Sequence, residues 1–198
     1  MSSTTVQLPT AAPRRHLSER QAKTVHRLTE AAVVELVEVG YPALTVRNVA
    51  KRAGVAPATA YTYFASKEHL VAEVFWRRFD AQEARSVDRR RSPASRATDV
   101  LLDFALVVAH ETELAAACTV ALLADDPEVR ELRLRIGLEM HRRLTEAVGD
   151  DAAPAAIQTL ELATTGALLQ VGTGHLAYDE IPDLLASAAA LVLGGATR

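Results

Sequence analysis

The chain has 198 residues, of which 49% are hydrophobic and 5% aromatic, and its formal net charge is −3. Alanine, leucine and valine dominate the hydrophobic set, which favours helices over sheet, and the length suits a small head with a larger core-bearing body. The single cysteine, Cys118, excludes an intramolecular disulfide. No hydrophobic run approaches the ~20 residues that span a bilayer. We therefore expect an all-α cytoplasmic protein with no membrane-spanning segment.

The charge is distributed unevenly along the chain. Up to Leu70 there are nine basic and five acidic residues, and the remainder holds thirteen basic and twenty acidic residues. A basic head on an acidic body favours contact with DNA through the head alone, because the phosphates repel the body. An excess of four positive charges is also ordinary surface variation, so this indication is weak by itself.

The first elements in chain order are a polar arm over residues 1–17 and a long helix after it. The arm lacks an apolar core and is predicted to be flexible, and its arginines could reach phosphates. Ser18 followed by Gln21 matches a capping box. Hydrophobic residues then recur at spacings of three and four until Gly40, and Gly40 with Pro42 two residues later is predicted to end the helix.

Residues 45–70 read TVRNVAKRAGVAPATAYTYFASKEHL and predict two short helices joined by a tight turn. Thr45 can cap the first helix, Gly54 suits the left-handed conformation that ends it, and Pro57 suits the first turn of the second. The second helix directs hydroxyl groups outward, on Thr59, Thr62 and Tyr63. Such groups hydrogen-bond phosphates and base edges, so this face has the chemistry of a DNA-recognition helix. A generic helical corner with a polar outer face fits the spacing equally well.

A set of residues follows a familiar order through this stretch: Thr45, Val49-Ala50, Ala53-Gly54-Val55, Thr59, Tyr61, Tyr63-Phe64, Ser66-Lys67-Glu68 and Leu70. This order resembles the DNA-binding motif of the TetR (tetracycline-repressor-like) family of transcriptional regulators. Three positions depart from the usual pattern. Ala56 stands where a capping serine is common, Ala58 where glycine is common, and Ala60 where a larger aliphatic residue is common.

The resemblance implies a two-part helical protein. A helix-turn-helix DNA-binding domain over residues 18–65 would follow the arm, and residues 66–198 would form a connecting helix with a ligand-binding and dimerisation domain. The implied function is that of a ligand-responsive regulator, a repressor that binds a near-palindromic operator in double-stranded DNA as a homodimer. A small hydrophobic or amphipathic effector would release it.

The expected DNA contacts fall into two groups. Those to phosphates are expected from Thr45, Arg47, Tyr63 and Lys67. Those nearest the bases are expected from Thr59, Tyr61 and Thr62, with the backbone around Pro57 and Ala58. Tyr61 could instead pack beneath its helix. Three basic residues on the early turns of the preceding helix could also reach the DNA backbone. They are Arg20, Lys23 and Arg27, and a solvated helix face explains them equally well.

The body is predicted to be helical throughout. Ser66 is expected to cap a long helix that runs to about Arg90, and Ser92-Pro93 breaks the pattern. Five further helices are predicted over residues 95–110, 113–123, 127–148, 154–177 and 182–193. In the resembled family the last two helices pair with their counterparts in a four-helix dimer interface. The alanine-rich and glycine-rich helices at this end of the chain suit that role.

Members of the resembled family commonly hold a small hydrophobic effector between the helices of the body. Candidate lining residues in this sequence are Phe75, Phe79, Phe104, Val108, Met140 and Leu169, with Cys118, Thr119 and His175 adding polarity. Each of these residues also fits a plain hydrophobic core. Because these candidate lining residues are mainly hydrophobic, we expect an apolar or amphipathic effector.

Other functions find little support in the sequence. The segment from Gly172 to Ala177 formally matches the dinucleotide fingerprint GxGxxG/A, but its flanks predict one continuous helix instead of a strand and a helix. The histidines show no metal-site spacing and no GxSxG elbow is present, so we expect no metal, no cofactor and no enzyme. A ligand-binding or protein-interaction module that uses its helix-turn-helix little remains the alternative. A small helical enzyme is a further alternative that no motif supports.

Overall fold

The computed structural model describes residues 18–83, 85–149 and 153–194, and in these ranges every regular element is a helix. The elements are α1 (Glu19–Ala43), α2 (Val46–Arg52), α3 (Pro57–Tyr61), α4 (Lys67–Ala81), α5 (Pro93–Ala105), α6 (Thr112–Leu122), α7 (Pro127–Val148), α8 (Pro154–Gly172), the short 3-10 helix η1 (Tyr178–Glu180) and α9 (Ile181–Gly194). The all-α prediction is confirmed. Within the described ranges each helix is too short or too polar to cross a bilayer.

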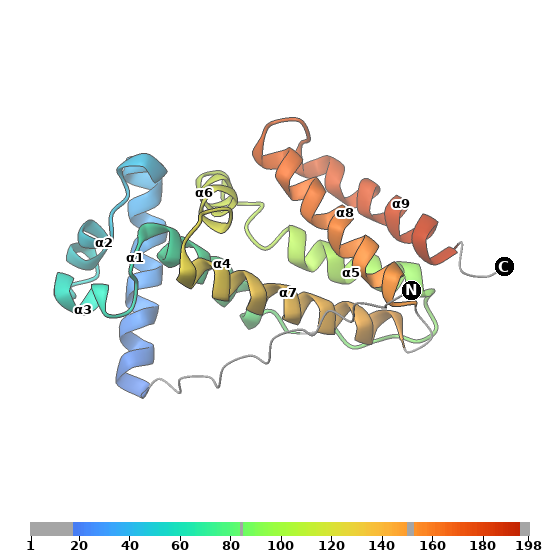
Figure 1. The fold of residues 1–198 in the computed structure, drawn as a ribbon, viewed down its shortest axis with the longest axis horizontal. Helices are drawn as coiled ribbons and strands as arrows, with labels where there is room; N and C mark the ends of the chain where they lie inside the picture. Colours follow the sequence, from blue (N-terminus) through green and yellow to red (C-terminus); the bar gives the residue numbers. More distant parts are fainter. Residues whose placement is uncertain (1–17, 84, 150–152, 195–198) are drawn as a thin grey trace, which may run out of the picture.

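The head consists of α1 with α2 and α3 on its outer side, at one end of the molecule (Figure 1). The predicted capping box starts α1, because the Ser18 hydroxyl accepts from the Gln21 backbone N–H at 3.3 Å and the Gln21 side chain accepts from the Ser18 N–H at 2.8 Å. At Gly40 the backbone leaves helical geometry, with φ 72° and ψ 162°. The helix is therefore interrupted where the glycine predicted it.

Local signals also set the turn between α2 and α3. The Thr45 hydroxyl accepts from the Asn48 N–H at 3.1 Å, and Gly54 takes the left-handed conformation with φ 62°. The start of α3 has no side-chain cap, because Ala56 carries no acceptor. Ala60 is fully buried, so the inner side of α3 is fixed in the core.

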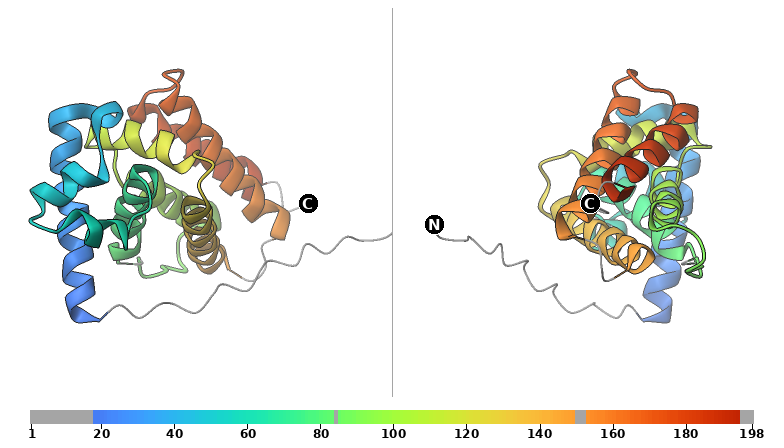
Figure 2. Two further views of the ribbon diagram at one scale, coloured as in Figure 1. Left: turned by 60° about the vertical axis from the view of Figure 1, so that its left-hand side comes forward. Right: turned by 90° about the vertical axis from the view of Figure 1, so that its right-hand side faces the viewer.

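The body packs in layers behind the head. Helix α4 leaves the head and packs against α1, α6 and α7, while α5 packs against α7 and α9. Helices α8 and α9 lie side by side at the other end (Figures 1 and 2). One cluster of buried hydrophobic residues runs from Val25 in α1 to Ala189 in α9. The predicted boundary at residue 66 thus crosses a continuous core, and the division into two domains stays a prediction.

The predicted end of α4 is wrong. The helix ends at Ala81 instead of about Arg90, and Gln82 is already extended. Arg85, in the basic segment after α4, forms a bidentate ion pair with Asp103 of α5, with N···O distances of 2.8 and 2.6 Å. Arg91 pairs with Asp99 of the same helix. These ion pairs favour a loop along α5 over further helical turns.

The predicted ends of α5 and α8 are also wrong. Helix α5 ends at Ala105 and is followed by turns up to residue 110. Helix α8 ends at Gly172, because Gly174 takes a positive φ of 76° and the N–H of His175 returns to the carbonyl of Gln170 at 2.9 Å. The segment that matches the dinucleotide fingerprint therefore starts at the last residue of α8, so a helix precedes it where the fingerprint requires a strand.

Candidate DNA-binding surface and internal cavity

The outer face of α3 is open to solvent and polar. Pro57, Ala58, Thr59 and Thr62 are exposed, and Tyr61 is 51% exposed, so it does not pack beneath the helix. The Thr62 hydroxyl donates to the Thr59 carbonyl at 2.6 Å, which leaves its lone pairs as acceptors. The residues predicted to lie nearest the bases therefore share one exposed surface.

The residues predicted to hold phosphates flank this surface and differ in how they are held. Thr45 caps α2, and Arg47 is exposed with no hydrogen bond to its guanidinium in the described part of the chain. Tyr63 is half-buried. The Lys67 ammonium donates to the carbonyls of Tyr41, at 2.9 Å, and Pro42, at 3.3 Å. An ammonium has three N–H groups, so Lys67 keeps one for another acceptor.

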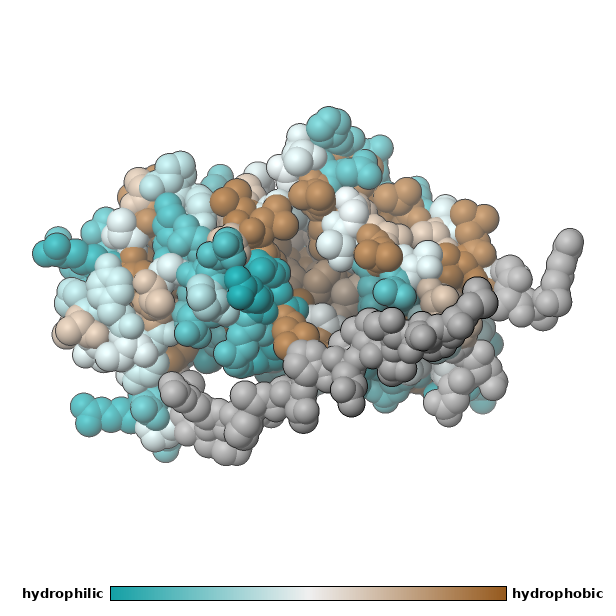
Figure 3. Space-filling view, in the orientation of Figure 1, coloured by the Kyte–Doolittle hydropathy of each residue, from teal (hydrophilic) through white to brown (hydrophobic). Residues whose placement is uncertain are grey.

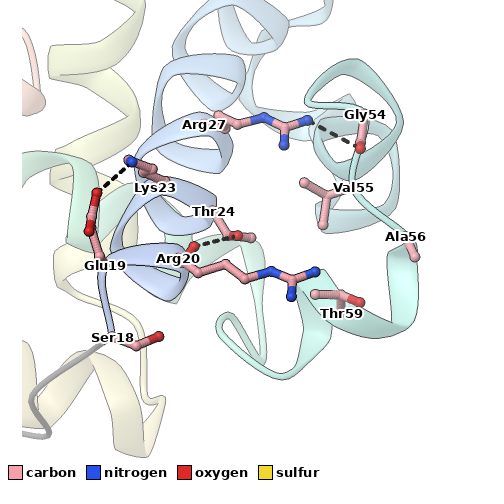
Figure 4. A pocket seen from close by; sticks show the side chains of 10 residues that line it. All are labelled: Ser18, Glu19, Arg20, Lys23, Thr24, Arg27, Gly54, Val55, Ala56 and Thr59. Carbon is pink, nitrogen blue, oxygen red and sulfur yellow. Dashed lines mark hydrogen bonds and ion pairs between the residues drawn. The ribbon is translucent and has the colours of Figure 1, made fainter.

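A groove of about 720 Å³ separates the start of α1 from the α2–α3 turn (Figure 4). Arg27 crosses it and donates to the carbonyls of Ala53 and, at 3.2 Å, Gly54, which ties the turn to α1. Lys23 pairs with Glu19 at 2.6 Å. Arg20 extends toward Thr59, and its guanidinium has no partner among the described residues. Among the residues that the structure describes, Arg20 is therefore the cation on the wall of this groove that has no partner.

A second hollow of about 510 Å³ lies inside the body, bounded by α4 to α8, and the face in Figure 3 is recessed there. Five residues predicted as its lining do line it, namely Phe75, Phe104, Val108, Met140 and Leu169. Two do not. Phe79 is fully buried behind them, with its ring centre 5.1 Å from that of Phe104, and His175 lies exposed in the turn after α8.

The cavity also has polar groups that the sequence analysis did not single out. They include Arg133, His141, Glu161, Thr165 and Tyr178. Nδ1 of His141 on α7 and a carboxylate oxygen of Glu161 on α8 lie 2.8 Å apart, a hydrogen bond that joins the two helices. The spacing of Arg133, Gly137 and His141, four residues apart on one helix, is the signal that could have placed them on one face.

Two other polar lining groups were named from the sequence, Cys118 and Thr119. Burial raises the pKa of the Cys118 thiol to about 12, so this group is neutral at physiological pH. Among the described residues no three His, Cys, Asp or Glu side chains gather as a metal site.

A hydrogen bond joins the starts of α4 and α7. The Ser66 hydroxyl accepts from the His69 N–H at 3.0 Å to cap α4, and it donates to the Asp126 carboxylate at 2.6 Å. The other oxygen of Asp126 caps α7, accepting from the Glu128 N–H at 2.8 Å and the Val129 N–H at 3.2 Å. The Ser66 bond, with these backbone bonds, lowers the pKa of Asp126.

The short α2, the glycine turn and the exposed α3 define a helix-turn-helix DNA-binding protein. The sequence model described as "Bacterial regulatory proteins, tetR family" matches residues 28–74, which span this unit. An HTH-type transcriptional regulator of Mycobacterium tuberculosis (strain ATCC 25618 / H37Rv) is 48% identical over 183 residues, which are 91% of this chain and 85% of the relative. The chain therefore belongs to the TetR family of transcriptional regulators, which are DNA-binding proteins and not enzymes.

Two further comparisons agree with this assignment. The HTH-type transcriptional repressor KstR of Rhodococcus jostii (strain RHA1) is 29% identical over 134 residues, 67% of this chain and 63% of the relative. A TetR transcriptional regulator from Rhodococcus sp. RHA1, known from its crystal structure, superposes with a TM-score of 0.73 at 24% identity over 89% of this chain and 98% of the other. The latter supports the fold.

Proposed function

We propose that the protein is a repressor that binds a near-palindromic operator as a homodimer and leaves it when an apolar or amphipathic effector fills the body cavity. The observation that carries this proposal is the exposed face of α3, where Thr59, Tyr61 and Thr62 offer hydroxyl groups to solvent. The relative KstR, which is a transcriptional repressor, supports repression over activation.

On DNA, Thr59, Tyr61 and Thr62 would lie nearest the bases, together with the backbone around Pro57 and Ala58. Phosphates would be held by Thr45, Arg47, Tyr63 and Lys67, and by Arg20 from the groove wall. Two α3 helices of a dimer would enter successive major grooves, which are roughly 34 Å apart. Arg47 and Arg20 suit phosphate contact because no acidic side chain competes for them in the described part of the chain.

Exposed leucines on α8 and α9 support the homodimer. They are Leu162 (67% exposed), Leu169 (45%), Leu184 (44%) and Leu191 (79%). Hydrophobic residues also gather over this end of the molecule in Figure 3. Large hydrophobic side chains exposed on neighbouring helices are typical of an interface between proteins, since their exposure to water is unfavourable.

Release would follow from contacts that the cavity shares with the head. Helix α6 lines the cavity and packs against α1 and α4. An effector that widens the cavity would move α6 and α4 and so change the separation of the two heads. The effector needs to prefer the released conformation by only a few kcal/mol, because a two-state equilibrium shifts about tenfold for each 1.4 kcal/mol.

The test is fluorescence anisotropy with DNA from upstream of the protein's own gene and with scrambled DNA of equal length, at about 50 and 200 mM salt. We expect a preference of about 10³-fold or more for the native fragment and a steep loss of affinity with salt. Thr59→Ala should weaken binding to the native fragment. Thr159→Ala is the matched control, because Thr159 is also an exposed threonine and lies on α8, away from α3.

Equal and weak binding to both fragments would contradict the proposed operator and favour the alternative of a ligand-binding or protein-interaction module. A Thr59→Ala variant that binds as tightly as the parent would contradict the assignment of α3 as the reading helix. A cavity ligand that binds the protein without changing its operator affinity would contradict the release step alone.

A further inference from the structure

Arg133 brings a positive charge to the wall of a largely apolar cavity. It lies on α7, on the same face as Gly137 and His141. One terminal nitrogen of its guanidinium donates to the carbonyls of Leu122, at 2.7 Å, and Ala124, at 2.9 Å, at the end of α6. These bonds fix the position of the group. Its Nε and second terminal nitrogen make no hydrogen bond within residues 18–83, 85–149 and 153–194.

Arg133 differs from the other arginines of α7 in lacking an acidic partner. Those arginines each pair with a carboxylate: Arg130 with Asp125, Arg135 with Glu131, Arg142 with Glu139 and Glu146, and Arg143 with Glu139. The carboxylate among the residues that line the cavity, that of Glu161, is hydrogen-bonded to His141. In the described part of the chain Arg133 therefore has no carboxylate within ion-pair distance.

The bonds to the end of α6 use one terminal nitrogen of the Arg133 guanidinium. They give no role to its Nε and its second terminal nitrogen. Arg133 is half-buried, so its charge is partly removed from water, and a partner of opposite charge would offset this cost. A guanidinium matches a carboxylate in planarity and donor spacing, and the pair forms strong charge-assisted hydrogen bonds. The remaining walls, with Phe75, Phe104 and Met140, suit a hydrocarbon portion.

Gly137 supplies room beside this charge. A Cβ built at this position meets no atom within 4 Å, so the glycine faces open space on the wall of the cavity. Glycine costs stability in the middle of a helix, and an alanine would fit here without a clash. The absent side chain thus leaves volume for a ligand one helical turn from Arg133.

We propose that the cavity binds an amphipathic molecule with a carboxylate group and that Arg133 holds this carboxylate while the hydrocarbon portion lies against the phenylalanine and methionine side chains. The proposal rests on the proposed function, because it takes the cavity to be the effector site. It narrows the effector from apolar or amphipathic molecules in general to anionic amphipaths.

The test is displacement of Nile red, a neutral apolar dye, from the full-length protein by dodecanoate and by dodecanol below their aggregation concentrations. The two competitors share a chain and differ in the head group. The variants are Arg133→Gln, which removes the charge, Arg133→Lys, which keeps it without the planar fork, and Arg135→Gln. The last is the matched control, because it removes a charge from the same helix outside the cavity.

We expect Arg133→Gln to weaken displacement by dodecanoate about tenfold to a hundredfold, the range for a hydrogen bond to a charged group. Displacement by dodecanol should stay unchanged. Arg133→Lys should recover part of the loss, and Arg135→Gln should resemble the parent. Equal effects of Arg133→Gln on both competitors, or no effect on either, would overturn the proposal. Thermal unfolding of each variant separates these effects from a loss of the folded state.

Gly137→Phe separates this proposal from the proposed function. Its ring would occupy part of the cavity next to Arg133, so binding of both competitors and of the dye should weaken strongly. If dye binding is unchanged in Gly137→Phe, the cavity is not the ligand site and the release step of the proposed function fails. If the dye is lost but Arg133→Gln affects the two competitors equally, the cavity remains the ligand site and the role of Arg133 alone is refuted.

Discussion

Two glycines in long helices should respond in opposite ways to the same substitution. At Gly172, the last residue of α8, an added Cβ would lie 2.4 Å from Cγ2, 2.9 Å from Oγ1 and 3.0 Å from Cβ of Thr119 in α6. The Thr119 side chain is branched, and its hydroxyl donates to the Ala115 carbonyl at 3.2 Å, so it cannot simply rotate away. At Gly137 an added Cβ meets nothing within 4 Å.

The magnitudes follow from these contacts. Overpacking costs about 1–3 kcal/mol, and alanine gains roughly 0.5–1 kcal/mol over glycine within a helix. Gly172→Ala should therefore lower the free energy of unfolding by about 1–2 kcal/mol. Gly137→Ala should raise it by roughly 0.5–1 kcal/mol.

The assay is urea unfolding at a fixed protein concentration, followed by the fluorescence of the single tryptophan, Trp76, which is 8% exposed. A fixed concentration is needed because association of subunits changes apparent stability. Thr119→Ala removes the two nearest atoms at the crossing and should relieve most of the cost of Gly172→Ala. Changes of the same sign at both glycines, or no relief from Thr119→Ala, would refute the reasoning.

Three other predictions concern single residues. Because burial raises the pKa of the Cys118 thiol to about 12, iodoacetamide should label it only after denaturation; labelling of the native chain at pH 8, detected by mass spectrometry, would contradict this. Glu139 has its pKa lowered to about 2, chiefly by its bond to Arg142. Its contribution to the free energy of unfolding is thus present above the ordinary carboxyl pKa and is lost as the pH falls toward 2. In urea unfolding, Glu139→Gln should therefore destabilise the protein by about 1–2 kcal/mol at pH 7, and this difference should disappear near pH 2. Leu191→Arg should convert a dimer to a monomer in light scattering, while Val37→Arg, an exposed position on α1, should not; a dimer that survives Leu191→Arg would argue against the α8–α9 interface.

The head was predictable because local signals fix it. Thr45 caps α2, Gly54 takes a positive φ, and Pro57 opens α3, and each of these depends on a few neighbouring residues. The capping box at Ser18 is equally local. Such signals operate whatever the rest of the chain does, so the sequence alone was sufficient for this region.

Contacts between distant segments account for what the sequence left open. The end of α4 depends on the pairing of Arg85 with Asp103, which lies eighteen residues further on. Phe75 and Phe79 lie four residues apart on one helix and both are buried, yet only the former reaches the cavity. A cavity is a place that side chains leave unfilled, and hydrophobic spacing identifies the buried face without indicating where that space lies.

The connection between cavity and head limits how the proposed release can work. Helix α6 is packed against α1 and α4 on one side and lines the cavity on the other, so a ligand cannot displace it without disturbing the head. The starts of α4 and α7 are joined by a hydrogen bond from Ser66 to Asp126. Ser66 also caps α4, and Asp126 also caps α7. Separating them would cost about 1.5–3 kcal/mol, the range for a hydrogen bond to a charged group. This cost is comparable to the conformational preference that an effector must supply, so an effector that binds the released conformation more tightly by this amount would be sufficient to move α4 relative to α7.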